Sequence, residues 1–131
     1  MRKQKYEVIA VAESRQQSLL RSGFALLGSN PIQAAYARSS RFLQAAQKLC
    51  KQRSFDVVHV EHLRGIASME PLLKEYPLIW DAVDCLSLLW KQIEILGASR
   101  AMRVFSSLES ARTERYEAYL LNSSASISTI S

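Results

Sequence analysis

The sequence has few of the residues that mark cofactor and redox sites. It contains only 2 cysteines, 4 glycines and 3 prolines in 131 residues. Cys50 and Cys85 lie far apart and neither belongs to a CxxC pair, so no zinc or dithiol motif is present. A reduced protein is the simplest interpretation of such cysteines. Neither G-x-G-x-x-G nor G-K-[ST] occurs, which excludes the common phosphate-binding fingerprints.

Long apolar runs are also missing. A membrane-spanning helix needs about 20 consecutive apolar residues, and no run approaches that length. The apolar stretch 8–12 is too short for a signal peptide and is soon followed by Glu13. From the sequence we therefore expect a cytoplasmic protein, with peripheral contact to the inner face of the membrane as an alternative.

The composition is that of one globular domain. Hydrophobic residues make up 48% of the chain, and 131 residues is the length of a single modest domain. The formal charge is +5, and one basic stretch carries no acid between Arg38 and Asp56. Its cations are Arg38, Arg41, Lys48, Lys51 and Arg53. Such a stretch suits an anionic partner such as a phosphate or a lipid headgroup, or it forms the solvated face of a helix.

Two apolar runs that end in polar groups are the most informative feature. FDVVHVEHLR (Phe55–Arg64) and LIWDAVDCLSLLW (Leu78–Trp90) each open with the Val- and Ile-rich composition of a buried strand. The segment between them is long enough for one crossover helix. In open parallel sheets, ligands bind beyond the carboxyl ends of the strands. The sequence therefore places its least ordinary polar side chains at that edge.

The rest of the chain alternates between helices and strands. Strands are predicted at Glu7–Ala12, Phe55–Val60 and Leu78–Val83, and Ala125–Ile130 fits a further one. An apolar-periodic piece lies near Phe24, whereas 32–38 is ambiguous between helix and extended chain. Ser39 or Ser40 is expected to cap a helix with one buried stripe. That stripe comprises Phe42, Leu43, Ala46, Leu49 and Cys50.

Later helices show similar signals. Pro71 is expected to break the crossover helix into two pieces, because its ring clashes with the preceding turn. Gly97 is expected to stop the helix Ser87–Leu96 in a left-handed conformation, and Ser99 to cap a long final helix. The predicted buried face of that final helix comprises Val104, Phe105, Leu108, Ala111, Tyr116, Tyr119 and Leu120.

This alternation predicts an α/β fold. The expected architecture is a partial Rossmann-like parallel sheet with helices on both faces, in one domain that spans residues 1–131. A strand opens the chain and another closes it, with no glycine-rich turn after the first.

The same motifs resemble a known family. FDVVHVEHLR, DAVDCLSLL and ARTERYEA look like parts of the N-terminal, acceptor-side domain of family 4 retaining glycosyltransferases of the GT-B architecture. The resemblance is strongest to bacterial sugar transferases of exopolysaccharide and exosortase systems, and covers roughly Tyr36–Ser131. It implies half of a GT-B N-terminal domain, without the first strand and without the donor-binding C-terminal domain.

The resemblance also implies a function. The parent reaction would transfer a sugar from a nucleotide-sugar to a glycan or lipid-linked acceptor, with retention at the anomeric carbon. This chain would hold no cofactor itself and would be inactive alone, and a companion chain would carry the donor domain. No metal site is expected, because no carboxylate pair has the spacing of a phosphate-binding metal site.

Glu61 and His62 are the catalytic candidates. In the family a polar residue at this strand end, often His, faces the reacting sugar, and here Glu61 takes that place with His62 beside it. Either side chain could bind a sugar hydroxyl or stabilise positive charge at the anomeric carbon. The alternative is a polar cap at the end of a strand. His59 points the other way and is predicted to be a core histidine.

The acceptor-binding candidates are Arg64, Asp84, Ser87 and Arg38. Arg64 opens the crossover helix, where free N–H groups and a guanidinium suit a phosphate or carboxylate. Asp84 either binds acceptor hydroxyls or caps the following helix, and Ser87 lies beside it. Arg38 precedes the basic helix, which could also contact a membrane surface.

A second class of function stays open. The chain could be a non-catalytic α/β binding module that uses its basic helix to meet an anionic partner. No nucleic-acid reading motif is present, so nucleic acid is not expected as a partner of the glycosyltransferase-like chain.

Overall fold

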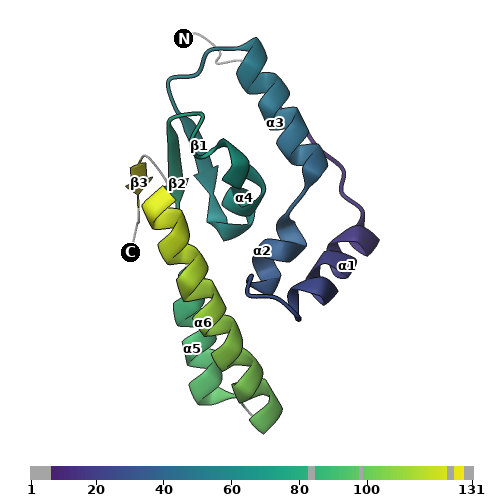
Figure 1. Ribbon diagram of the computed structural model, residues 1–131, viewed down its shortest axis with the longest axis vertical. Helices are drawn as coiled ribbons and strands as arrows, with labels where there is room; N and C mark the ends of the chain where they lie inside the picture. Colours follow the sequence, from purple (N-terminus) through teal and green to yellow (C-terminus); the bar gives the residue numbers. More distant parts are fainter. Residues whose placement is uncertain (1–6, 83–84, 98, 124–125, 129–131) are drawn as a thin grey trace, which may run out of the picture.

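The computed structural model describes residues 7–82, 85–97, 99–123 and 126–128. Figure 1 shows a small sheet beside a long helical hairpin, with shorter helices on the opposite side. The elements are α1 (Arg15–Ala25), α2 (Ile32–Ala37), α3 (Ser40–Gln52), β1 (Val58–Glu61), α4 (His62–Met69), the 3₁₀ helix η1 (Glu70–Leu72), β2 (Leu78–Asp81), α5 (Leu86–Leu96), α6 (Arg100–Ser123) and β3 (Ser126–Ser128).

The sheet is parallel, in the order β1-β2-β3. Val58 pairs with Leu78, and the register continues to Glu61 opposite Asp81. The chain is therefore of the α/β class. The strand predicted at Phe55–Val60 is present as β1, which begins later, at Val58, and has a neighbour on one side only within the described residues.

Residues 7–12 do not form the predicted strand. The segment is irregular, and Val8 is 86% exposed. Glu7 pairs with Arg53 at one end of the segment, with 2.6 Å between Oε2 and Nη2. Strand-forming side chains are present there, but no strand among the described residues supplies a backbone ladder for them.

Helix α3 begins as predicted but is less buried than predicted. The Ser39 Oγ accepts a hydrogen bond from the Phe42 N–H at 3.1 Å, which confirms the cap. No α3 residue is fully buried, and Phe42 is 39% exposed. Leu43 and Ala46 pack against the core from this helix. The stripe therefore faces the core, but its outer half has no partner among the described residues.

The core lies between β1, β2, the crossover and the end of α6. Its buried members include Val60, Leu63, Ile66, Leu72, Leu78, Trp80, Tyr116 and Leu120. The predicted break at Pro71 is confirmed, because α4 ends at Met69 and η1 follows directly. Burying a side chain of this size contributes about 1.5–3 kcal/mol, so this cluster is the main source of stability.

The turn between α5 and α6 confirms one predicted helix end and contradicts another. The Ser99 Oγ accepts the Met102 N–H at 3.2 Å, so the predicted cap is confirmed. Gly97, however, has φ −60°, so its left-handed stop is wrong. A Cβ on Gly97 would meet the Ile93 carbonyl oxygen at 2.8 Å, so close backbone approach explains this glycine.

The buried face of α6 is largely polar. Most of the predicted apolar face is wrong, since Val104, Phe105, Leu108 and Tyr119 are exposed and only Tyr116 and Leu120 are fully buried. Phe105 still contacts α5, because its ring lies edge-on to Trp90 with centroids 5.8 Å apart. The other buried residues of α6 are Ser106, Glu109, Ser110 and Thr113.

No helix in the described part of the chain is both long enough and apolar enough to cross a bilayer.

Candidate functional site at the carboxyl ends of the strands

The carboxyl ends of β1 and β2 lie side by side. Glu61 and Asp81 are register partners, and His62 follows Glu61 directly. The predicted pairing of two parallel strands is thereby confirmed. Asp84, the third predicted member of this edge, lies outside the described residues.

His62 has an unusual backbone conformation. Its φ is 62°, and within the described ranges it is the sole non-glycine residue with positive φ. The left-handed conformation costs an L-residue about 1–2 kcal/mol because Cβ approaches the following carbonyl oxygen. Such costs persist where the surrounding structure imposes them, and they concentrate at functional sites. His62 allows the chain to leave β1 and enter α4 without a loop.

A small hollow of about 170 Å³ adjoins this turn. Its lining comprises Gln33, His62, Leu63, Arg64 and Leu86. The hollow brings together two predicted residues, His62 and Arg64, and adds Gln33 from α2. Ligand pockets usually span roughly 300–1,000 Å³, so this hollow suits one end of a ligand.

Gln33 was missed by the sequence analysis. Its Oε1 is buried without a hydrogen-bond partner in the described structure, which leaves an acceptor beside His62 and Arg64. The ambiguous signal of residues 32–38 could not have placed this side chain, because its position depends on how α2 packs on α4.

Asp81 and His59 form a second polar pair near the same edge. The His59 Nε2 lies 3.8 Å from the Asp81 Oδ2, while the Asp81 Oδ1 is buried without a described hydrogen-bond partner. The His59 side chain is 50% exposed, so its prediction as a core histidine is wrong. Side chains alternate along a strand, and Val60 takes the buried face of β1, so His59 lies on the opposite, exposed face.

Ser87 belongs to a different environment. Its Oγ donates to the Glu117 Oε2 at 2.7 Å, and its carbonyl oxygen accepts from the Ser110 Oγ at 3.4 Å. These bonds join α5 to α6 in a buried contact. An acceptor-binding role for Ser87 stays a prediction, and any such role would compete with the bond to Glu117.

Arg38 also lies apart from the strand ends. Its Nη2 donates to the Glu70 Oε2 at 2.5 Å, and the Tyr116 hydroxyl donates to the same oxygen at 2.9 Å. Burial raises the pKa of Tyr116. Burial opposes the charge on Arg38, but its interactions with Tyr116 and Glu70 prevail and raise the pKa of the guanidinium.

The described part of the chain contains no group of three or more His, Cys, Asp or Glu side chains that could hold a metal ion. The polar groups at the strand ends can donate and accept hydrogen bonds, exchange protons and bind an anion.

Comparisons with protein-family models, with curated proteins and with solved structures found no match to this chain. The resemblance to family 4 glycosyltransferases therefore stays a prediction that depends on the residues quoted above.

Proposed function

We propose that this chain is the acceptor-side part of a retaining GT-B glycosyltransferase. In this proposal the sheet belongs to a larger Rossmann-like layer with helices on both faces. The parallel order β1-β2-β3 supports it, because each connection between neighbouring strands runs through helices. Such crossovers are the defining units of Rossmann-like sheets.

The left-handed conformation of His62 at the edge of the sheet carries this proposal most directly. Glu61 and Asp81 form neighbouring positions there, and His62 and Arg64 line one hollow. A conformation that costs free energy at this edge is better explained by placement of an imidazole than by a solvated strand end.

Each side chain would have a distinct task. Glu61 or His62 would accept a hydrogen bond from an acceptor hydroxyl or stabilise positive charge at the anomeric carbon. Arg64, in the first turn of α4, would bind a phosphate or carboxylate of the acceptor. Asp84 and Ser87 would contact further acceptor hydroxyls. A separate domain would supply the nucleotide-sugar donor.

The outer edge of β1 offers a place for a companion chain. A groove of about 420 Å³ lies along it, and its apolar lining includes Phe42, Leu49, Phe55 and Val57. A strand edge without a partner in the described part of the chain, beside apolar side chains, favours the addition of a strand. This groove supports the proposal that a further strand and the donor domain come from outside the chain.

The test is NMR titration with short-chain polyprenyl-diphosphate monosaccharides as soluble acceptor mimics. We expect saturable shifts at the amides of residues 61–64, and none with UDP-glucose, because this proposal assigns donor binding to a separate domain. His62→Asn, which tolerates positive φ, should weaken binding about tenfold or more. His59→Asn, on the same strand, should not. The proposal fails if no mimic shifts residues 61–64.

The binding-module alternative also has structural support. Helix α3 carries no acidic residue, and Arg41, Lys48 and Lys51 are exposed on it. Co-sedimentation with anionic and neutral lipid vesicles tests this alternative. Binding that needs anionic lipid, falls steeply with salt and survives His62→Asn would favour the module over the enzyme fragment.

A further inference from the structure

A second and larger hollow lies away from the strand ends. It measures about 640 Å³ and shares no lining residue with the hollow at His62. Residues of α1, of the junction between α2 and α3, of α4, of η1 and of the end of α6 line it. Its polar lining includes Arg21, Arg38, Glu70, Lys74, Tyr119 and Ser123. Its volume falls within the range of small-molecule sites.

Glu70 presents one occupied and one open oxygen here. Both Arg38 and Tyr116 donate to its Oε2, at 2.5 and 2.9 Å. None of the hydrogen bonds among the described residues uses its Oε1. The carboxylate is therefore held in a fixed orientation and can still accept a hydrogen bond from a ligand hydroxyl.

Positive charge remains in surplus around this hollow. Arg21 is paired with Glu13 at 2.8 Å, and Arg38 with Glu70. Hydrogen bonds from Ser39 and Arg21 lower the pKa of the Glu13 carboxyl, so that pair is charged near neutral pH. Lys74 has no ion-pair partner within the described ranges, so one cation is available for a ligand anion.

A further unsatisfied donor lies in the same lining. The Nε of Arg21 is buried and has no hydrogen-bond partner in the part of the chain that is described. A buried N–H without an acceptor costs about 1–3 kcal/mol. An oxygen-rich ligand in the hollow could remove that cost.

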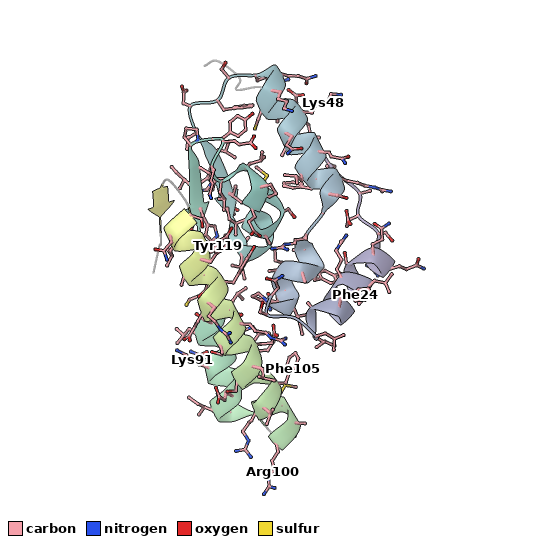
Figure 2. All side chains as sticks on the ribbon, in the orientation of Figure 1. Phe24, Lys48, Lys91, Arg100, Phe105 and Tyr119 are labelled. Carbon is pink, nitrogen blue, oxygen red and sulfur yellow. The ribbon has the colours of Figure 1, made fainter. Side chains whose placement is uncertain are left out.

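An aromatic side chain forms part of the wall. Tyr119 is 47% exposed, and its ring stacks on Tyr116 with centroids 6.2 Å apart and an interplanar angle of 25°. Figure 2 places Tyr119 on the half of α6 that is nearer the sheet, well away from Phe105 and Arg100. The stacking fixes the ring and leaves much of the residue open to contact the apolar C–H face of a sugar.

We propose that this hollow binds a monosaccharide that carries one anionic group. Lys74 pairs with the phosphate or carboxylate, the Glu70 Oε1 and the Arg38 guanidinium bind neighbouring hydroxyls, and Tyr119 packs against the ring. Inorganic anions lack the ring, and neutral sugars lack the charge, so both bind more weakly. This inference does not depend on the function proposed for the strand ends.

Calorimetric titration with glucose 1-phosphate, glucuronate, glucose and inorganic phosphate tests the site. At least one of the two anionic sugars should bind about tenfold more tightly than glucose and inorganic phosphate. The better of the two identifies phosphate or carboxylate as the anionic group. NMR shifts caused by the anionic sugar should centre on residues 70–74 and 119, whereas short-chain polyprenyl-diphosphate monosaccharides should shift residues 61–64.

Variants at exposed positions complete the experiment. Lys74→Ala and Tyr119→Ala should each weaken the anionic sugar about fivefold or more. Thermal unfolding should be unchanged in Lys74→Ala and only slightly lower in Tyr119→Ala, which loses its stacking on Tyr116. Lys48→Ala, which removes an exposed cation of α3 outside the lining, should leave affinity unchanged. The proposal is overturned if neither anionic sugar saturates by about 10 mM, if inorganic phosphate binds as tightly, or if both variants bind normally.

Discussion

The sheet region and the α5–α6 hairpin are built on opposite plans. Around β1, β2 and α4, large apolar side chains such as Ile66, Leu72 and Trp80 are buried together. In the hairpin the buried positions of α6 include Ser106, Glu109 and other polar residues, while large apolar side chains face outward. Apolar periodicity therefore indicates a face that can be buried, and a partner surface decides whether it is.

The largest expected difference between the two regions comes from a matched pair of leucines. Leu72 is fully buried, and Leu108 is 55% exposed. Leu72→Ala should lower the free energy of unfolding by about 2–5 kcal/mol, because it removes buried area and leaves a cavity. Leu108→Ala should change it by less than about 0.5 kcal/mol. Urea denaturation measures both, and similar losses would show that the hairpin surface is covered in solution.

The polar interior of the hairpin should also be sensitive to substitution. Glu109 is fully buried, its Oε2 accepts the Ile32 N–H at 2.9 Å, and its Oε1 accepts from the Arg112 Nη1 at 2.9 Å. Glu109→Ala should cost about 3 kcal/mol, because both donors lose their acceptor and Arg112 loses its counter-charge.

Glu114 provides the surface control for that variant. It pairs with Lys91 at an exposed position of the same hairpin. Glu114→Ala should cost less than about 1 kcal/mol. Calorimetric unfolding measures both variants. If Glu109→Ala and Glu114→Ala lower stability equally, the hydrogen bonds of Glu109 do not anchor α6 to α2.

A smaller effect should distinguish backbone strain from side-chain function at His62. His62→Gly should be more stable than His62→Ala by about 1–2 kcal/mol, because only glycine adopts φ 62° without a steric cost. Thermal unfolding of the two variants measures this difference. If alanine is as stable as glycine, the left-handed turn does not persist in solution.

The smallest expected effect concerns alkaline pH. Burial raises the folded-state pKa of Tyr116 above its ordinary value of 10.0. Below pH 10 the phenol is protonated in both states, so its contribution is constant. Above pH 10 the unfolded chain ionises first, so stability falls, by less than about 1 kcal/mol at pH 10.5.

Tyr116→Phe should make the stability profile flatter above pH 10, measured by urea denaturation across that range. Tyr119→Phe keeps the buried phenol of Tyr116 and should retain the wild-type slope. The hydrogen bond to Glu114 raises the folded-state pKa of Lys91, so the contribution of Lys91 to stability also falls as pH rises. A residual slope is therefore expected in Tyr116→Phe. An unchanged slope in Tyr116→Phe would contradict the assignment.

Local signals predicted much of the fold. The sequence predicts Ser39 or Ser40 as one cap and Ser99 as another, because a hydroxyl before an apolar-periodic segment satisfies a free N–H, and the structure selects Ser39. Pro71 was recognised as a break because its ring is incompatible with a continuous helix. The parallel pairing of β1 with β2 followed from the strand, helix, strand order.

Properties that depend on distant partners were not predictable. Residues 7–12 have the composition of a strand, yet no described strand lies beside them. At the candidate site the sequence supplied Glu61, His62 and Arg64 but not Gln33, which α2 brings from another part of the chain. Nothing in the sequence indicated that Arg38 would lie in a separate hollow with Glu70.

The order of the strands has a consequence for synthesis on the ribosome. β2 can pair with β1 as soon as the short crossover has emerged, but β3 follows only after all of α5 and α6. Pairings between distant segments form slowly, because the chain loses entropy in closing the loop before the contacts stabilise it. During translation, one edge of β2 therefore stays unpaired until β3 is synthesised, and a chaperone or an early partner could bind to that edge.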